Sequence, residues 1–105
     1  MGNQIEILVV GNHEKIMEIL LRYINNDENW TATAAHTLDE AKEVFERKIF
    51  DIVLISSGFD DNTEQEMIRF FNEKNARTEV VLHFGGGTGL LFNEIHAAIE
   101  RLNSK

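Results

Sequence analysis

The sequence predicts an α/β protein built on a doubly wound parallel sheet, with helices on both faces of the sheet. Residues 52–55 are an unbroken apolar run, and residues 5–10 are a second such run apart from Glu6, which is the pattern of strands that are buried on both faces. Between such runs, apolar residues recur at the spacing of an amphipathic helix. Strands and helices that alternate with short connections are typical of a parallel sheet covered by helices.

The first strand is expected at residues 5–10 (IEILVV), where it ends at Gly11 and Asn12. The apolar period then changes to that of a helix over residues 13–25, and Asn12 is a plausible N-cap for this helix. Residues 25–29 (NNDEN) form a polar turn. This part of the chain therefore reads as a strand, a helix and a turn.

The second strand and helix follow directly. Residues 30–36 (WTATAAH) alternate weakly and are rich in threonine, as an edge or half-exposed strand would be. Thr37 and Glu40 form a capping box, in which each residue bonds the backbone of the other at the start of a helix. That helix is expected to end near residues 47–48.

The central stretch of the chain is residues 50–61, FDIVLISSGFDD. Its apolar run predicts a buried strand, which breaks abruptly at Ser56 and leads into a loop with two carboxylates, Asp60 and Asp61. Open α/β sheets place their ligand sites at the carboxyl ends of strands. A site is therefore expected at this loop, although the residue at the exit of the strand is a serine.

The last third of the chain repeats the alternation. Thr63 and Glu66 give a second capping-box signal for a helix that extends to about residue 75. Residues 78–84 (TEVVLHF) predict the fourth strand, and residues 85–89 (GGGTG) predict a flexible break. A final helix is indicated by apolar residues at helical spacing, which are Leu91, Ile95, Ala98, Ile99 and Leu102.

Composition limits the classes of function. The 105 residues suit one domain, residues 1–105, and the net charge of −8 argues against binding to nucleic acid or to anionic membranes. With no cysteine, neither a disulfide framework nor a thiolate zinc site is possible. No signal peptide or membrane span is recognisable, so a cytoplasmic location with protein or small-molecule partners is expected.

Four segments, taken in order, resemble a response-regulator receiver domain, which has a flavodoxin-like fold. They are IEILVVGNHE, AHTLDEAKEVF, FDIVLISSGFDD and TEVVLHF. The resemblance extends from about residue 5 to residue 84 and resumes in the final helix. It implies a sheet with strands in the order 2-1-3-4, the second and third helices on one face, and the first and last helices on the other.

The resemblance also implies a chemistry, in which a phosphoryl group is transferred to an aspartate after the third strand beside a bound magnesium ion. Here the acceptor position is Ser56, and the positions of the acidic pair that holds the metal are Gly11 and Asn12. The Ser/Thr position after the fourth strand is His83 or Phe84. The five residues 85–89 are too few for a helical crossover, so one helix and the strand that carries the family's lysine are missing.

We therefore interpret the chain as a degenerate, non-enzymatic receiver with no cofactor, which acts through protein partners. In the implied sheet the fourth strand is an exposed edge with one charge, Glu79, and such edges pair with other strands unless a charge or a covering loop blunts them. A homodimer or an added partner strand is expected there. The edge residues are Thr78, Glu79, Val80, Val81, Leu82, His83 and Phe84.

Several alternatives stay open at the strand ends. Asp60 and Asp61 are candidates for cation contacts or for a displaced phospho-acceptor, or form a solvated turn in which Asp61 or Thr63 caps the next helix. Residues 85–89 either cradle a phosphate or let the chain turn sharply. Ser56 as a nucleophile lacks a GxSxG elbow.

The second function class is a small ligand- or metal-binding domain at the rim of the sheet. It would use His13, Ser56, Asp60, His83 and residues 85–89. His13, His36 and His83 all fall near strand ends, and neutral imidazoles bind zinc or copper. No metal is expected, however, because the strands that carry His36 and His83 are far apart in the implied sheet. His96 is expected at or near the surface of the final helix.

Overall fold

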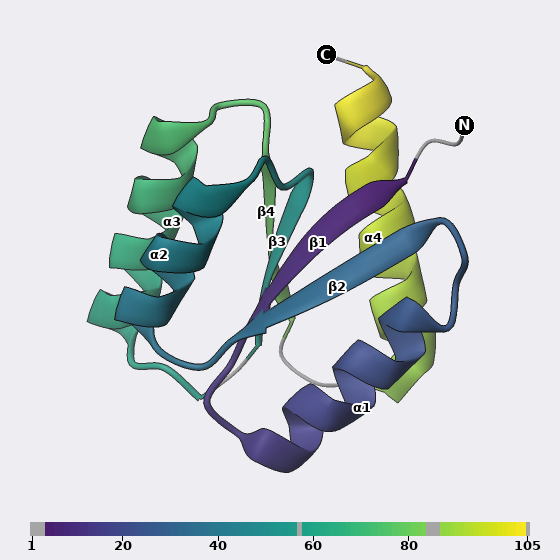
Figure 1. Ribbon diagram of the computed structural model, residues 1–105, viewed down its shortest axis with the longest axis horizontal. Helices are drawn as coiled ribbons and strands as arrows, with labels where there is room; N and C mark the ends of the chain where they lie inside the picture. The colour runs from purple at the N-terminus through teal and green to yellow at the C-terminus, as the bar shows by residue number, and fades with distance from the viewer. Residues whose placement is uncertain (1–3, 57, 84–86, 105) are drawn as a thin grey trace.

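The computed structural model describes residues 4–56, 58–83 and 87–104. In this part of the chain four strands alternate with four helices, as expected (Figure 1). In chain order they are β1 (Ile5–Val10), α1 (Glu14–Asn25), β2 (Trp30–Ala35), α2 (Leu38–Arg47), β3 (Ile52–Ser56), α3 (Asp61–Lys74), β4 (Glu79–His83) and α4 (Gly87–Asn103). None of the helices, over the residues described, has the length and apolarity needed to cross a membrane.

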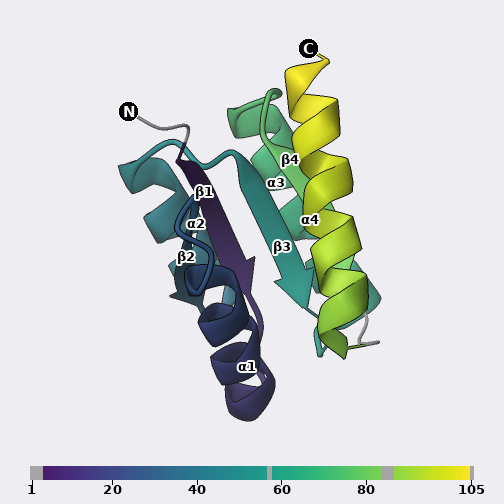
Figure 2. The ribbon, with the colours of Figure 1, turned by 90° about the vertical axis from the view of Figure 1, so that its right-hand side faces the viewer.

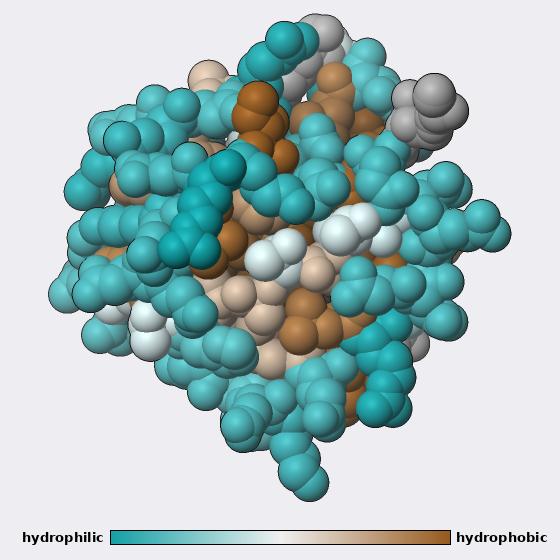
Figure 3. All heavy atoms as spheres, viewed as in Figure 1, coloured by the Kyte–Doolittle hydropathy of each residue, from teal (hydrophilic) through white to brown (hydrophobic). Residues whose placement is uncertain are grey.

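The four strands form one parallel sheet in the order β2-β1-β3-β4, which confirms the predicted order. All five residues of β3 and the last four of β1 are buried, which explains their unbroken apolar runs. Both β2 and β4 are edge strands, and most of their residues are only partly buried. Figure 3 looks onto β2, where neutral and hydrophobic side chains are surrounded by hydrophilic ones.

Two helices cover each face of the sheet. Successive side chains of a strand point to opposite faces, so Ile7 and Val9 join the core under α1 and α4, and Leu8 and Val10 join the core under α2 and α3. Figures 1 and 2 show α1 and α4 on one side of the sheet, with α2 and α3 on the other. The predicted docking of the last helix on the face of the first is confirmed.

The cap of α1 is His13, so the prediction of Asn12 is wrong. The Nδ1 atom of His13 accepts a bond from the backbone N–H of Ile16 at 3.4 Å. The side-chain amide of Asn12 instead donates to the carbonyl of Gly58 at 2.8 Å. Both residue types can accept at an N-cap, and the helix begins at Glu14, directly after His13.

The cap of α2 is Thr37, as predicted. Its hydroxyl accepts from the N–H of Glu40 at 3.1 Å. The reciprocal half of the capping box differs, because the carboxylate of Glu40 accepts from the N–H of His36 at 2.7 Å, one residue before the cap. The start of this helix therefore still has two satisfied backbone donors.

The cap of α3 is Asp60, and the predicted caps Asp61 and Thr63 are wrong. Asp60 accepts from the N–H of Thr63 at 2.7 Å, and Asp61 lies in the first turn. Glu66 does not complete a capping box, since its carboxylate pairs with Lys42 of α2 at 3.2 Å. This pair joins the two helices on that face of the sheet.

The predicted glycine break is partly helical. Gly87, Thr88 and Gly89 belong to the first turn of α4, while Phe84 and residues 85–86 lie outside the described residues. The helix is held by side chains further along, because Leu91, Ile95 and Ala98 are buried against the sheet. Packing of an amphipathic face, rather than propensity, accounts for most helix stability in proteins, so glycines in the first turn are tolerated.

The docking of α4 can be tested by substitution of Ile95, which is fully buried in the core under α1 and α4. Ile95→Ala should lower the free energy of unfolding by about 2–5 kcal/mol, because it leaves a cavity between helix and sheet. Asn93→Ala, at an exposed position of the same helix, should change it by less than about 0.5 kcal/mol. Urea denaturation measures both, and equal effects would contradict the docking.

Candidate functional site

One row of residues lies at the carboxyl ends of β1, β3 and β4. It consists of Gly11, Ser56 and His83. Side chains alternate along a strand, so Ser56 and His83 point to the same face as Leu54 and Val81, the face under α1 and α4. Ser56 and His83 are register partners, and both are buried, at 2% and 3% exposure. Gly11 follows β1 beside them, because its neighbour Val10 pairs with Ile55.

A side chain at position 11 would collide with the core. A Cβ atom on Gly11 would lie 2.6 Å from the sulfur of Met17 and 3.1 Å from Cβ of Ser56. Met17 is 1% exposed on the buried face of α1. The space for an acidic side chain after β1 is therefore filled by a methionine, a side chain that adapts well to irregular core gaps.

The loops after β1 and β3 are joined by a direct hydrogen bond. The Nδ2 atom of Asn12 donates to the carbonyl of Gly58 at 2.8 Å. Gly58 has a φ of +118°, a conformation that side chains rarely adopt, and a Cβ there would collide with the Asn12 side chain. The amide of Asn12 thus links the two loops, and it presents a donor where a cation would need an acceptor.

A buried pair joins the end of β4 to α4. The Nδ1 atom of His83 lies 2.5 Å from Oε1 of Glu94, and the side chains are 4% and 19% exposed. The sequence predicted His83 at the rim but not its partner. Glu94 directly precedes the buried Ile95, so its place at the border of the apolar face of α4 was the available signal.

This pair does not make a catalytic triad with Ser56. A serine nucleophile needs its hydroxyl within hydrogen-bond reach of the histidine, and among the described residues no hydrogen bond joins Ser56 to His83. Both side chains are also buried in the row. The site therefore has a histidine–acid pair and a serine, but not the contact that would couple them.

The two acidic residues after β3 serve the start of α3. Hydrogen bonds from the Thr63 hydroxyl and then from the Thr63 backbone N–H hold the pKa of Asp60 below its usual value of 3.8. Asp61 is exposed in the first turn, where its charge favours the positive end of the helix dipole. The structure thus gives Asp60 a role in helix capping.

The four histidines do not form a cluster. His13 caps α1, and His36 lies beyond the edge strand β2, with its Nδ1 atom 3.5 Å from Glu40. His83 is on the opposite edge strand, and His96 is exposed on α4 as expected. In the described ranges, no group of three or more His, Asp or Glu side chains is placed to hold a metal ion.

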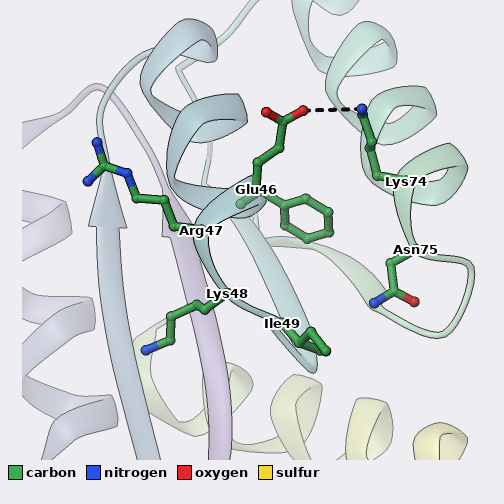
Figure 4. A pocket seen from close by; sticks show the side chains of 7 residues that line it. Glu46, Arg47, Lys48, Ile49, Lys74 and Asn75 are labelled. Atoms are coloured by element: carbon green, nitrogen blue, oxygen red, sulfur yellow. Dashed lines mark ion pairs between the residues drawn. The ribbon is translucent and has the colours of Figure 1, made fainter.

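A hollow lies at the other end of the sheet, near the start of β3 (Figure 4). Its charged side chains are already paired, since Lys74 lies 3.2 Å from Glu46 and Lys48 lies 3.0 Å from Glu6. Ile49, which is 75% exposed, forms part of its wall. The hollow combines solvated ion pairs with one apolar side chain and shows no constellation for catalysis.

The open side of β4 differs from that of β2. The N–H of Glu79 donates to the carbonyl of Asp51, the residue before β3, so the alternation of a parallel ladder turns the N–H groups of Val80 and Leu82 away from the sheet. No described residue accepts from either of them. Glu79 is the only acidic residue of β4. Its carboxylate accepts a hydrogen bond from Nε of Arg101 on α4 at 2.6 Å.

On β2, by contrast, two of the three outward N–H groups, those of Trp30 and Ala32 but not that of Ala34, have acceptors among the described residues. The N–H of Ala32 donates to the side chain of Asn25 at 2.8 Å, and that of Trp30 donates to the carbonyl of Asp27 at 3.1 Å. An edge whose donors are already paired is a poorer template for another strand. The described part of the sheet thus has one partly blunted edge at β2 and one open edge at β4.

No family model matches the sequence, and no curated protein matches it. Similar solved structures include the signal receiver domain of an HD domain-containing protein from Pseudomonas fluorescens Pf-5, with a TM-score of 0.85 and 15% identity over 97% of this chain and 99% of that chain. Another is the non-phosphorylated HemR receiver domain from Leptospira biflexa, with a TM-score of 0.72 and 18% identity over 97% and 96%. A two-component response regulator from Clostridium difficile has a TM-score of 0.71 and 13% identity over 95% and 99%. The chain therefore has the flavodoxin-like fold of receiver domains.

The capping role of Asp60 makes a prediction for pH dependence. Because its pKa is lower in the folded state, the carboxylate stabilises the fold above its usual value of 3.8, and this contribution is lost as pH falls through the folded pKa. Asp60→Asn keeps a capping acceptor but does not titrate. The difference in urea midpoint between wild type and Asp60→Asn should shrink between about pH 6 and about pH 2. A difference that stays constant over this range would contradict the assignment.

Proposed function

We propose that this protein is a non-enzymatic pseudo-receiver, a phosphorylation-independent interaction or dimerisation module of bacterial-type signal transduction in the cytoplasm. The observation that carries the proposal is the packing of the row at the carboxyl ends of the strands. A receiver-like fold surrounds this row, but Met17, Asn12 and the His83–Glu94 pair occupy it. The domain then acts by contact rather than by chemistry.

The lack of carboxylates at three positions of the strand ends supports the proposal that the domain does not hold a magnesium ion. Magnesium binds oxygen ligands and is usually held by one or two carboxylates. Gly11, Asn12 and Ser56 supply no carboxylate, and the amide of Asn12 points an N–H at the loop after β3. Asp60, the first carboxylate after β3, caps α3. Without a metal or an acceptor carboxylate, phosphoryl transfer has no nucleophile and no counter-charge.

The open edge of β4 supports the interaction role. Val80 and Leu82 direct unpaired N–H groups outward, and Glu79 is neutralised by Arg101 rather than kept as a protecting charge. Leu90, which is 45% exposed, lies one turn before Glu94 on the side of α4 that contacts β4. We infer an edge-to-edge homodimer in which two copies of β4 pair and Leu90 adds apolar contact beside them.

The absence of receiver chemistry can be tested with magnesium and beryllofluoride, an analogue of the phosphoryl group. Calorimetry should show no saturable heat for the mixture, and the melting temperature should not change, because Gly11, Asn12 and Ser56 offer no carboxylate to either ion and Glu94 is paired with His83. Magnesium alone and fluoride alone serve as controls for effects of ionic strength. Binding of one beryllofluoride per chain that depends on magnesium would sink the pseudo-receiver proposal.

The dimer can be tested by light scattering across a range of protein concentrations. The wild-type mass should approach twice 12.0 kDa, and Leu82→Lys should stay a monomer, since lysine on an edge strand opposes pairing. Thr33→Lys places the same charge in the middle of β2, and this control should still dimerise. A concentration-independent monomer for the wild type, or equal loss in both variants, would rule out the β4 interface.

A further inference from the structure

A second hollow, away from the row and from the β4 edge, is lined by aromatic rings. It lies between the last turn of α1, the turn that follows it, the start of β2 and the first half of α4. Its walls are Tyr23, Asn26, Asp27, Trp30 and Phe92. We propose that this hollow binds an organic cation with a head group of the trimethylammonium type.

Three of its five lining residues are aromatic. The ring centroids of Trp30 and Phe92 lie 6.5 Å apart with their planes inclined at 45°, so the two rings form adjacent walls rather than a closed stack. Tyr23 is the third aromatic wall. The faces of such rings carry negative potential and attract cations, and aromatic cages of this kind bind quaternary ammonium groups.

A carboxylate completes the hollow. Asp27 is half-buried in its wall, and its Oδ1 atom is fixed by a hydrogen bond from the N–H of Asn29 at 2.9 Å. Its negative charge therefore has a defined place beside the rings. The net charge of −8 for the whole chain adds a long-range field that concentrates cations at its surface.

Phe92 is held in position although it is 45% exposed. His96, one turn further along α4, lies 4.2 Å from the Phe92 ring and 5.4 Å from the Trp30 ring, measured between centroids. His96 does not line the hollow, so it supports the wall from outside. A wall that is ordered before the ligand arrives reduces the entropy lost on binding.

The chain places its own cations over other aromatic rings. Lys42 and Lys74 lie 5.3 Å and 5.7 Å from the centre of the Phe70 ring, and Lys48 lies 5.5 Å from that of Phe50. Among the described lysines and arginines, none is placed over Tyr23, Trp30 or Phe92. No described cation of the chain therefore competes for these rings, of which Phe92 is 45% exposed and Trp30 is 6% exposed.

The volume of the hollow suits one small head group rather than a large ligand. Its volume is about 200 Å³, which is below the ~300–1,000 Å³ of pockets for drug-sized ligands. A trimethylammonium group is compact and weakly hydrated, so it can enter an open aromatic hollow with little desolvation cost. The same group occurs on a free small amine and on a trimethylated lysine side chain of a partner protein.

The test uses the fluorescence of Trp30, the one tryptophan of the chain, together with NMR shifts of its indole N–H. Choline should produce a saturable change, and its neutral isostere 3,3-dimethylbutan-1-ol should bind at least about tenfold more weakly, because it fills the hollow without a charge. Acetyl-trimethyllysine amide is the second cation. Tighter binding of that compound than of choline would identify a partner side chain as the source, and the reverse would identify a free amine.

Two variants and a control complete the experiment. Phe92→Leu keeps an apolar side chain without the ring, and Asp27→Asn keeps the hydrogen bond from Asn29 without the charge, so each should weaken choline binding by about tenfold. Asn93→Ala, at an exposed position of α4 that does not line the hollow, should leave it unchanged. Urea denaturation verifies that every variant is folded. Equal responses to choline and the neutral isostere, or no saturable response at about 10 mM choline, would overturn the proposal.

Discussion

The constraint on which this structure depends is that a four-stranded parallel sheet has two apolar faces, and only four helices are present in the described chain to cover them. The helices α2 and α3 fill one face, so α4 must lie beside α1 on the other. Leu91, Ile95 and Ala98 bury the half of that face which α1 leaves bare. This placement covers a face of β4 and leaves its outer edge open.

The docking of the helices on this face also determines which side chains fill the row at the strand ends. Once α4 lies against β4, Glu94 comes within 2.5 Å of His83, and the pair ties the helix to the last residue of the strand. At the end of β1, two strands away from β4, Met17 of α1 fills the space above Gly11. Both helices on this face thus place side chains into the row. Each of these contacts occupies space that a ligand would otherwise fill.

The sequence predicted the fold well because the fold is encoded in local periodicity. Apolar runs identified β1 and β3, and the threonine-rich run at β2 identified a half-exposed strand. The strand order came from the resemblance to receiver domains, and the structure has the same order. Packing then follows, since only one arrangement covers both faces.

The details of the site were harder to predict because they depend on contacts between distant segments. Asn12 and His13 are both able to cap α1; His13 does so, and the Asn12 side chain bonds Gly58, 46 positions along the chain. Likewise, His83 and Glu94 meet only because α4 folds back over β4. The aromatic hollow joins residues of α1, β2 and α4, and no single segment of sequence carries its signal.

The central claim is that function has moved from the strand-end row to the edge of β4, and hydrogen exchange tests it most directly. The amide groups of Val80 and Leu82 should exchange more slowly as protein concentration rises, because a second copy would accept their hydrogen bonds. The amides of β1, which lie inside the sheet, provide the internal reference. Exchange at Val80 and Leu82 that is fast and independent of concentration would contradict the account.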